Sequence, residues 1–364
     1  MPKVVISGYY GFHNSGDEAI LYAMLLALGD AVPGLEAIVL SKDPGYTARE
    51  FGVRSIARDN PRQVFNALGE ADLLISGGGG LLQDVTSPKS IIYYLGVVTM
   101  AKLLRKPVFF YAQGIGPINT TLGRALVRLV ANRVNAITVR DSDSKDELAA
   151  LGVTRPPVYV TADPVLGLEP SRINVNKGRE ILSSLGVGGG PVAGISVRPW
   201  KGLDGYKKVM AKVADNLVEE GWQVLLVPMH CPGDMETCRE VASMMHAEAF
   251  LWDDKAEYTD LLAVTANLDL SIGMRLHFLI FSAIFGVPVV GIPYDPKVNL
   301  FLQSLGLPPG LSAESLDYAE LSSRIKQVLK DRVGVSAGLK ERVAPLRGEA
   351  LKNASLVAEL LKGG

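Results

Sequence analysis

The sequence of 364 residues is poor in cysteine, almost neutral and without a long apolar run. Its two cysteines, Cys231 and Cys238, are separated by six residues, which suits neither a zinc knuckle nor a disulfide framework, so both are expected to be reduced thiols. Lys and Arg number 37 against 38 Asp and Glu, and the net charge of -1 disfavours a bulk polyanion such as nucleic acid as a partner. The longest uncharged run, residues 278–294, is interrupted by Gly286 and Pro288 and predicts a helix, a turn and a strand rather than a membrane span.

Several common motifs are also missing. The turn that begins at Gly8 has neither the Gly-x-Gly-x-x-Gly pattern of dinucleotide-binding proteins nor the Lys-Ser/Thr ending of a P-loop, so neither NAD nor ATP binding is expected. No His, Cys and carboxylate residues have the spacing of metal ligands, and we expect neither a metal nor a cofactor. The first residues lack a secretory signal pattern, so the predicted location is the cytoplasm.

What the sequence does contain is a regular alternation of strand-like apolar runs with helical patterns, which predicts an α/β fold with parallel sheets covered on both faces. A chain of this length exceeds what one hydrophobic core usually supports. We expect a Rossmann-like doubly wound domain over residues 1–170, a second over 171–335, and a C-terminal helix, 336–364, that packs back on the first. The expected strands cover residues 4–7, 37–40, 72–76, 108–113, 136–140, 158–161, 192–197, 223–228, 268–272 and 287–292.

The junction at residues 271–277 is the strongest site candidate. An apolar run ends at Ile272 and another begins at Phe278, which predicts a buried strand that enters a helix through Gly273. Ligands of open α/β sheets bind at such carboxyl ends of strands, and a helix N-terminus attracts anions. Arg275 offers a planar fork for a carboxylate or phosphate, and His277 can transfer a proton near neutral pH. The plain alternatives are a surface ion pair and a core histidine.

Three further candidates also come after expected strands. Arg140 ends one strand of the first domain, and Lys297 and His230 follow strands of the second. An arginine or lysine at such a position can neutralise an anionic ligand. For Lys297 and His230, a solvated surface lysine and a solvated loop histidine are the alternatives.

The first domain also has two glycine-rich turns. The four glycines from Gly77 to Gly80 indicate a close approach of the backbone to a ligand or to a packed helix, and both remain open. Ahead of them in the chain, Asn14 or Ser15 suits the N-cap of the helix after the first strand, with Asp17 in its first turn.

Five segments stand in series between Lys3 and about Leu307. They are Gly8-Tyr9-Tyr10-Gly11 with Asn14-x-Gly16-Asp17-Glu18-Ala19, then Ser76-Gly77-Gly78-Gly79-Gly80, Gln113-Gly114-Ile115-Gly116-Pro117, Arg140-Asp141, and Gly273-Met274-Arg275-Leu276-His277. In this order they resemble the polysaccharide pyruvyl transferase family, and within it the bacterial enzymes of cell-surface polysaccharides. The resemblance implies a GT-B-like fold, in which two Rossmann-like domains face each other across a cleft.

The resemblance also implies a reaction and its donor site. Pyruvate would pass from phosphoenolpyruvate to the 4- and 6-hydroxyls of a sugar, giving a cyclic ketal and phosphate. In the bacterial enzymes that this chain resembles, the sugar is N-acetylmannosamine of secondary cell-wall polymers that anchor S-layer-homology domains. The implied donor-binding residues are Arg140, Arg275, Leu276 through its backbone N–H, His277 and Lys297. We assign His277 as the acid that protonates the methylene carbon, and Arg275 and Lys297 as the cations that stabilise the departing phosphate.

The sugar acceptor is expected on the loops of the first domain. The candidate acceptor-binding residues are Asn14, Ser15, Asp17, Gly78, Gly79 and His230. The base that receives the hydroxyl proton stays open among Asp17, Asp163 and His230.

An acceptor linked to a lipid diphosphate would bring the protein to the inner face of the membrane. Arg124, Arg128 and Arg133 then form either a basic landing area or an ordinary solvated helix face. Two other classes of function share the expected fold: a glycosyltransferase that uses a nucleotide sugar, and a noncatalytic sugar-binding protein.

Overall fold

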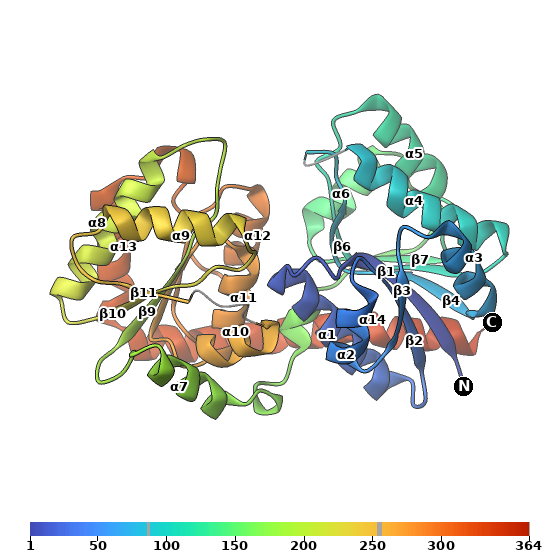
Figure 1. Cartoon of the computed structure of the whole chain (residues 1–364). Coiled ribbons are helices and arrows are strands. Elements are labelled where there is room, and N and C mark those ends of the chain that lie inside the picture. The colour runs from blue at the N-terminus through green and yellow to red at the C-terminus, as the bar shows by residue number, and fades with distance from the viewer. Residues whose placement is uncertain (86–87, 253–256, 364) are drawn as a thin grey trace. The chain divides into compact units, whose positions relative to one another are not determined.

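The computed structural model describes residues 1–85, 88–252 and 257–363, which form two compact units (Figure 1). Unit 1 comprises Met1–Gly167 and Leu346–Gly364, and unit 2 comprises Leu168–Pro345. The expected domains have their boundaries at residues 170 and 335. Both chain termini therefore belong to unit 1.

Unit 1 contains one sheet in which all neighbouring strands are parallel, as the alternation predicts. The strand order is β3-β2-β1-β4-β6-β7-β8, and β5 also pairs with β6. The strands are β1 (Lys3–Tyr10), β2 (Glu36–Ser41), β3 (Arg54–Ala57), β4 (Leu73–Ser76), β5 (Gly79–Leu82), β6 (Val108–Ile115), β7 (Ala136–Val139) and β8 (Val158–Val160).

Helices cover both faces of this sheet, because its strands are apolar on both sides. Val5, Leu74 and Phe110 face a core shared with α3 to α6, while the alternate residues Val4 and Ile6 are wholly buried on the other side. Burial of each such side chain contributes about 1.5–3 kcal/mol. The helical elements are α1 (Ser15–Ala31), α2 (Pro44–Phe51), α3 (Pro61–Glu70), α4 (Pro88–Leu103), α5 (Thr121–Ala131), α6 (Ser142–Ala150) and η1 (Pro164–Gly167).

The strand order of unit 1 reverses between β1 and β4. Ser7 and Ser76 are paired in register, and the Gly77 N–H donates to the Ser7 carbonyl at 2.7 Å. Ligands of doubly wound sheets bind at this kind of switch point. The loops that contain the expected acceptor residues therefore leave the sheet at its ligand-binding edge.

Two strands of unit 1 differ from the prediction. Gly79–Leu82, expected as part of a turn, is strand β5, and Gly79 pairs with Gln113 of β6. Arg54–Ala57, for which no strand was expected, is the edge strand β3. Its residues are exposed or half-buried and do not form an apolar run, so the hydrophobic pattern gives no signal there.

Unit 2 contains a second parallel sheet with the order β11-β10-β9-β12-β13. Its switch point lies between β9 and β12, where the Met274 N–H donates to the Ser196 carbonyl at 2.9 Å. The strands are β9 (Val192–Ser196), β10 (Gln223–Leu226), β11 (Phe250–Leu251), β12 (Leu270–Gly273) and β13 (Val289–Gly291). The helical elements are η2 (Pro170–Arg172), α7 (Val175–Ser184), α8 (Gly205–Glu219), α9 (Gly233–Met244), α10 (Tyr258–Thr265), α11 (Leu276–Phe285), α12 (Pro296–Ser304), η3 (Ala313–Ser315) and α13 (Tyr318–Lys330).

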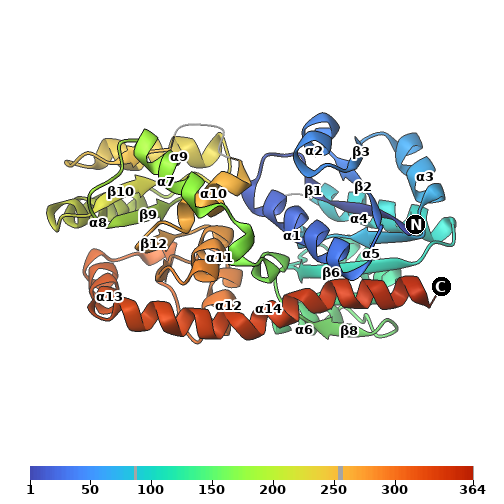
Figure 2. The ribbon, with the colours of Figure 1, turned by 90° about the horizontal axis from the view of Figure 1, so that it is seen from below.

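The last helix, α14 (Arg332–Lys362), contributes to both units and is seen along its length in Figure 2. It begins four residues before the expected start at 336, and the division between the units falls at Pro345, inside the helix. In unit 1 the Thr161 hydroxyl donates to Oδ1 of Asn353 at 3.0 Å, and both residues are buried. None of the described helices is both long and apolar enough to cross a bilayer.

Candidate active site

In unit 2, four neighbouring strand ends carry polar or cationic side chains at the switch-point edge. Arg198 follows β9, His230 and Asp234 follow β10, Arg275 follows β12, and Lys297 follows β13. The sheet register holds these ends together, since the Ile292 N–H donates to the Gly273 carbonyl and the Val227 N–H to that of Ile195, both at 2.8 Å. This edge therefore concentrates positive charge where an open α/β sheet binds its ligand.

Arg275 is the N-cap of α11 rather than a residue of its first turn. Its Nε and Nη2 donate to the two oxygens of Asp234 at 2.8 and 2.5 Å. The Asp234 side chain is wholly buried, and it also accepts the Met229 N–H at 3.2 Å. A bidentate pair of this kind fixes the plane of the guanidinium. Asp234 is thus a positioning residue, and no sequence pattern had indicated a role for it.

Leu276 and His277 open the first turn of α11, as predicted. This apolar helix is almost entirely buried, and its N-terminus lies at the end of β12. The His277 ring is half-buried and tilted against Phe281, with ring centroids 6.4 Å apart. The start of a helix carries the positive end of its dipole, so the N-terminus of α11 adds dipolar attraction for an anion to the charge of Arg275.

Lys297 lies in the first turn of α12, which Asp295 caps by accepting the Lys297 N–H at 3.1 Å. The ammonium is 3.3 Å from the Asp295 carboxylate and 5.5 Å from the centroid of the Tyr294 ring. Burial raises the pKa of Tyr294, but the positive charge of Lys297 and of two arginines lowers it more, so the pKa falls below its ordinary value. The two arginines are Arg198 and Arg275.

His230 is half-buried in the loop after β10. Burial, Arg275 and Arg198 lower the pKa of its imidazole, against the opposing charge of Asp234. The imidazole is therefore held in its neutral form around neutral pH, which suits a proton acceptor. The structure groups His230 with the cations of unit 2, whereas the five other expected acceptor residues belong to unit 1.

Arg140 follows β7 in unit 1 and is held by carboxylates. Its Nη1 lies 3.1 Å from Oδ2 of Asp163 and its Nε 3.8 Å from Asp141. The Arg140 side chain is 9% exposed and that of Asp163 5%. A Cβ added at Gly114 would come within 2.8 Å of the guanidinium, so a larger residue there would displace the end of the Arg140 side chain. Asp163, a candidate base, thus also positions Arg140.

The expected acceptor residues of unit 1 gather at the β1–β4 switch point. Asn14 is the N-cap of α1 and accepts the Gly16 N–H at 3.1 Å, which resolves the choice between Asn14 and Ser15. Ser15 is buried, and Asp17 is half-buried in the first turn. A Cβ added at Gly78 would come within 2.8 Å of Ile20, so this glycine has a packing role against α1.

Glu18 of the same turn is a buried carboxyl group that was not among the expected site residues. It accepts the Gly11 N–H at 2.8 Å and so ties the loop after β1 to α1. Burial raises the pKa of Glu18 to about 8, although the N–H groups of Gly11, His13 and Phe12 lower it.

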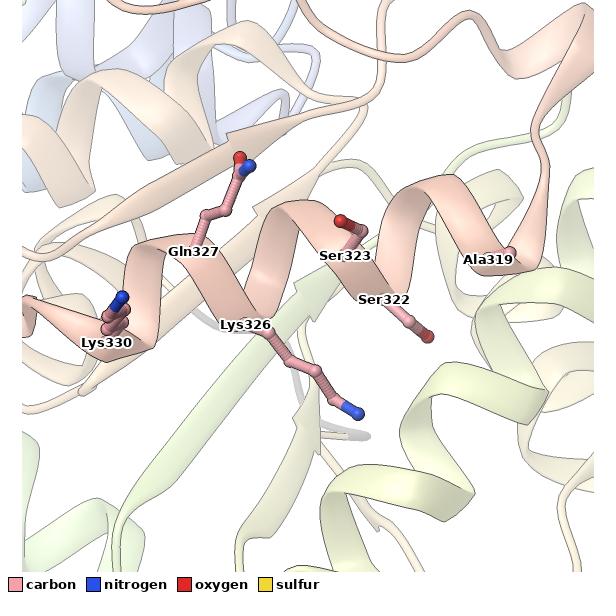
Figure 3. A pocket seen from close by; sticks show the side chains of 6 residues that line it. All are labelled: Ala319, Ser322, Ser323, Lys326, Gln327 and Lys330. Atoms are coloured by element: carbon pink, nitrogen blue, oxygen red, sulfur yellow. The ribbon is translucent and has the colours of Figure 1, made fainter.

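A hollow of about 420 Å³ occurs on α13 of unit 2. All six residues that line it come from this one helix, and Figure 3 shows their side chains along it. Because one exposed helix face offers no convergent groups, we do not assign it as a site. Within the described residues, no three His, Cys, Asp or Glu side chains stand together as a set of metal ligands.

Comparison with known proteins identifies the family. The family model described as polysaccharide pyruvyl transferase matches residues 14–296, a segment that begins after β1 and includes β9 and β12, the two strands of the unit 2 switch point. The chain belongs to the polysaccharide pyruvyl transferase family. A relative is the amylovoran biosynthesis protein AmsJ of Erwinia amylovora, which is 26% identical over 286 residues, covering 74% of this chain and 68% of AmsJ.

Solved structures confirm the GT-B-like fold class. Anabaena HepE in complex with UDP-glucose has a TM-score of 0.69 and 15% sequence identity over all of both chains. The S. aureus MnaA–UDP structure has a TM-score of 0.70 and 12% identity over 98% of this chain and 95% of that one. At these identities the likeness concerns the fold. As a family member, the protein is a transferase of polysaccharide biosynthesis.

Proposed function

We propose that this protein transfers pyruvate from phosphoenolpyruvate to the 4- and 6-hydroxyls of a sugar, with formation of a cyclic ketal and release of phosphate. The sugar is proposed to be N-acetylmannosamine of a lipid-linked cell-wall polymer precursor. The observation that carries this proposal is the set of Arg275, His277 and Lys297 at the β12 and β13 ends, in a chain of the pyruvyl transferase family.

The donor's chemistry agrees with this set of residues. Phosphoenolpyruvate carries a carboxylate and a phosphate, and both are recognised best by charge-assisted hydrogen bonds. Asp234 fixes the Arg275 guanidinium, and Lys297 supplies a second positive charge. The backbone N–H of Leu276, the first residue of α11, can donate a further hydrogen bond to the donor. Arg140 of unit 1 is proposed as a further donor-binding residue.

The proposed reaction starts with proton transfer from His277 to the methylene carbon, which makes C2 of the donor electrophilic. One sugar hydroxyl then attacks C2 and loses its proton to a base. The second hydroxyl attacks the same carbon as the C2–O bond to phosphate breaks, the bonding electrons leave with the phosphate, and the departing phosphate takes up the proton of this hydroxyl. Arg275 and Lys297 stabilise that departing charge. The scheme uses no metal or cofactor.

For the base we favour His230 over Asp17 and Asp163. Its pKa is lowered by burial and by Arg275 and Arg198, so it is neutral and able to accept a proton at working pH. Asp163 is engaged by Arg140 at 3.1 Å. The acceptor is proposed to contact Asn14, Ser15, Asp17, Gly78 and Gly79 in unit 1.

A lipid-diphosphate acceptor would place the enzyme in the cytoplasm at the inner membrane face, and its product would serve S-layer anchoring. Arg124 is paired with Glu147 at 3.3 Å, so it is less available for a lipid surface than Arg128, which is exposed.

The test is to incubate the purified protein with phosphoenolpyruvate and a diphosphate-linked acceptor that ends in N-acetylmannosamine. Acceptor-dependent phosphate release, with a mass gain of one pyruvate less one water, is the expected result. A parallel reaction replaces phosphoenolpyruvate with UDP-sugars. Release of a nucleoside diphosphate there, without phosphate release from phosphoenolpyruvate, would establish the alternative, a nucleotide-sugar-dependent GT-B glycosyltransferase.

A further inference from the structure

Arg198 stands in a cluster of aromatic rings at the end of β9. Its guanidinium carbon lies 4.4 Å from the centroid of the Tyr294 ring and 5.8 Å from that of Trp200. The two rings are 5.0 Å apart and tilted by 61°. The Arg198 carbonyl accepts the Tyr206 hydroxyl at 2.6 Å, which anchors the loop to α8. The rings and this anchor restrict the orientation of the planar guanidinium.

Among the described residues, Arg198 has no carboxylate partner of the kind that neighbouring cations have. Arg275 is paired with Asp234, Lys297 with Asp295, and Lys201 of the same loop with Glu314 at 2.6 Å. Arg198 meets no carboxylate in the described parts of unit 2. Its Nε donates only weakly, at 3.4 Å, to the carbonyl of Pro199. Since Arg198 is half-buried, its charge is partly desolvated without a counter-ion, and an anionic ligand would supply one.

The place of Arg198 in the sheet agrees with a ligand role. β9 and β12 flank the switch point of unit 2, and the ends of both carry an arginine. Arg198 and Arg275 act electrostatically on the same two groups, since both lower the pKa of His230 and that of Tyr294. The two guanidinium groups therefore contribute to one positive region.

We infer that Arg198 is an arm of a phosphoryl-binding site at the β9–β12 switch point, with Trp200 and Tyr294 holding its guanidinium in place. The inference rests on the proposed function for the identity of the ligand, a small phosphate ester. The same chemistry is present in the diphosphate of a lipid-linked acceptor. In either case a planar fork can bind two phosphoryl oxygens at once, which a lysine cannot.

The test measures binding to the full-length protein by calorimetry, with phosphoenolpyruvate and inorganic pyrophosphate as separate probes. Arg198→Gln is expected to weaken binding by about 10-fold to 100-fold, the range for a lost hydrogen bond to a charged group. Lys201→Gln is the matched control. Its ammonium lies 5.0 Å from the Trp200 ring centroid but is paired with Glu314, so binding should stay within about twofold of wild type.

Arg198→Lys keeps the positive charge but replaces the planar guanidinium by an ammonium group. This variant tests the inference if Arg198→Gln does not fold. We expect it to bind at least about fivefold more weakly than wild type, because the ammonium cannot donate two parallel hydrogen bonds. In steady-state kinetics, loss of a phosphoryl-binding side chain should raise KM for the donor. A purely structural defect would instead lower the unfolding temperature and leave the KM of the remaining folded enzyme unchanged.

The two probes separate the sources of the phosphoryl group. A loss confined to phosphoenolpyruvate assigns Arg198 to the donor, and a loss confined to pyrophosphate assigns it to the acceptor diphosphate. Unchanged binding of both probes by folded Arg198 variants would overturn the inference, as would failure of the wild type to bind either. If wild type binds the probes, Arg198→Gln does not, and no phosphate is released from phosphoenolpyruvate with any acceptor, the proposed function fails and the anion site stands.

Discussion

In each unit a buried aspartate holds an arginine at a strand end, but the two arrangements differ. In unit 2, Arg275 makes two hydrogen bonds to Asp234, which is wholly buried. In unit 1, Arg140 makes one at 3.1 Å to Asp163, whose other oxygen accepts the Val165 N–H at 3.1 Å. The guanidinium plane of Arg275 is therefore the more strongly fixed of the two.

The residues after each arginine differ as well. Arg275 is followed by Leu276 and His277 in the apolar helix α11, so a group able to transfer a proton lies beside the cation. Arg140 is followed by Asp141, which caps α6 by accepting the Ser144 N–H at 2.7 Å. The same strand-to-helix junction thus combines charge with proton transfer in unit 2 and charge with a helix cap in unit 1. Chemistry is expected to depend mainly on unit 2.

The largest expected effect concerns His277, the proton-transfer group that follows Arg275 and has no counterpart after Arg140. His277→Gln should lower kcat by about 10²-fold to 10⁴-fold, the usual contribution of general acid catalysis, with a much smaller change in KM. Steady-state kinetics with phosphoenolpyruvate measure both constants. His246→Gln, at an exposed histidine of the same unit, is the control and should leave kcat unchanged. A proportional loss of binding and turnover in His277→Gln would instead assign His277 to binding.

The second prediction compares the two aspartates through stability. Asp234→Asn should reduce the free energy of unfolding by about 3–5 kcal/mol, because it removes a wholly buried carboxylate that makes two hydrogen bonds to the Arg275 guanidinium. Asp163→Asn should cost less, since the Arg140–Asp163 pair has one hydrogen bond of 3.1 Å, whereas the Arg275–Asp234 pair has two, of 2.8 and 2.5 Å. Urea denaturation monitored by circular dichroism measures both losses.

The double variant Asp234→Asn/Arg275→Gln is the control, because it removes the charge together with its partner. It should recover part of the lost stability. Equal losses in Asp234→Asn and Asp163→Asn would mean that the two pairs are equivalent and that the geometric difference has no energetic consequence.

These pairs also show how far sequence reasoning reaches. Arg275 and Arg140 were predictable because each comes just after an apolar strand, and ligands of parallel sheets bind at the carboxyl ends of the strands. Asp234 was not, because its partner is 41 positions away and no local pattern connects them. Arg198 is predictable as a loop residue at the same edge. That no carboxylate of the described residues pairs with it is seen only when the neighbouring cations and their partners are compared.

The fold, too, was predicted only in part. Strands with continuous apolar runs, such as β4 and β12, were expected within one or two residues at each end. The edge strand β3 and the glycine-led β5 were not, because one is half-exposed and the other begins with two glycines. Gly78 suggested a close approach, and the structure identifies Ile20 of α1 as the neighbour, which no spacing rule predicts.

The third prediction compares the two arginines in donor binding. Arg275→Ala and Arg140→Ala should each weaken phosphoenolpyruvate binding by about 1.5–3 kcal/mol in calorimetry. Unchanged binding in either folded variant would remove that arginine from the donor site. Gly114→Ala offers a milder change in unit 1, since its methyl group displaces the Arg140 guanidinium without removing the charge. Gly80→Ala is its control, because no atom lies within 4 Å of the added Cβ.

The last comparison concerns the loops after the first strand of each unit. The loop after β9 is held by the rings around Arg198, whereas the loop after β1 is held by the carboxyl group of Glu18. Burial raises the pKa of Glu18 to about 8, from an ordinary value of 4.5. Between these values the folded chain keeps a proton that the unfolded chain releases. Stability therefore falls as the pH rises through this window, and it changes no further above the folded pKa.

Glu18→Gln removes this titration and keeps a carbonyl oxygen for the Gly11 N–H. The stability of the variant relative to wild type should rise by about 1.4 kcal/mol per pH unit between the two pKa values, as linkage requires for one proton. Urea denaturation at pH 5, 6, 7 and 8, roughly spanning that window, measures the slope. Glu70→Gln is the control, because Arg54 lowers the pKa of that exposed carboxyl group, which stays ionised throughout the window. If Glu18→Gln and wild type have parallel pH profiles, Glu18 is ionised in the folded protein, and the loop after β1 then rests on a buried negative charge stabilised by its backbone N–H groups.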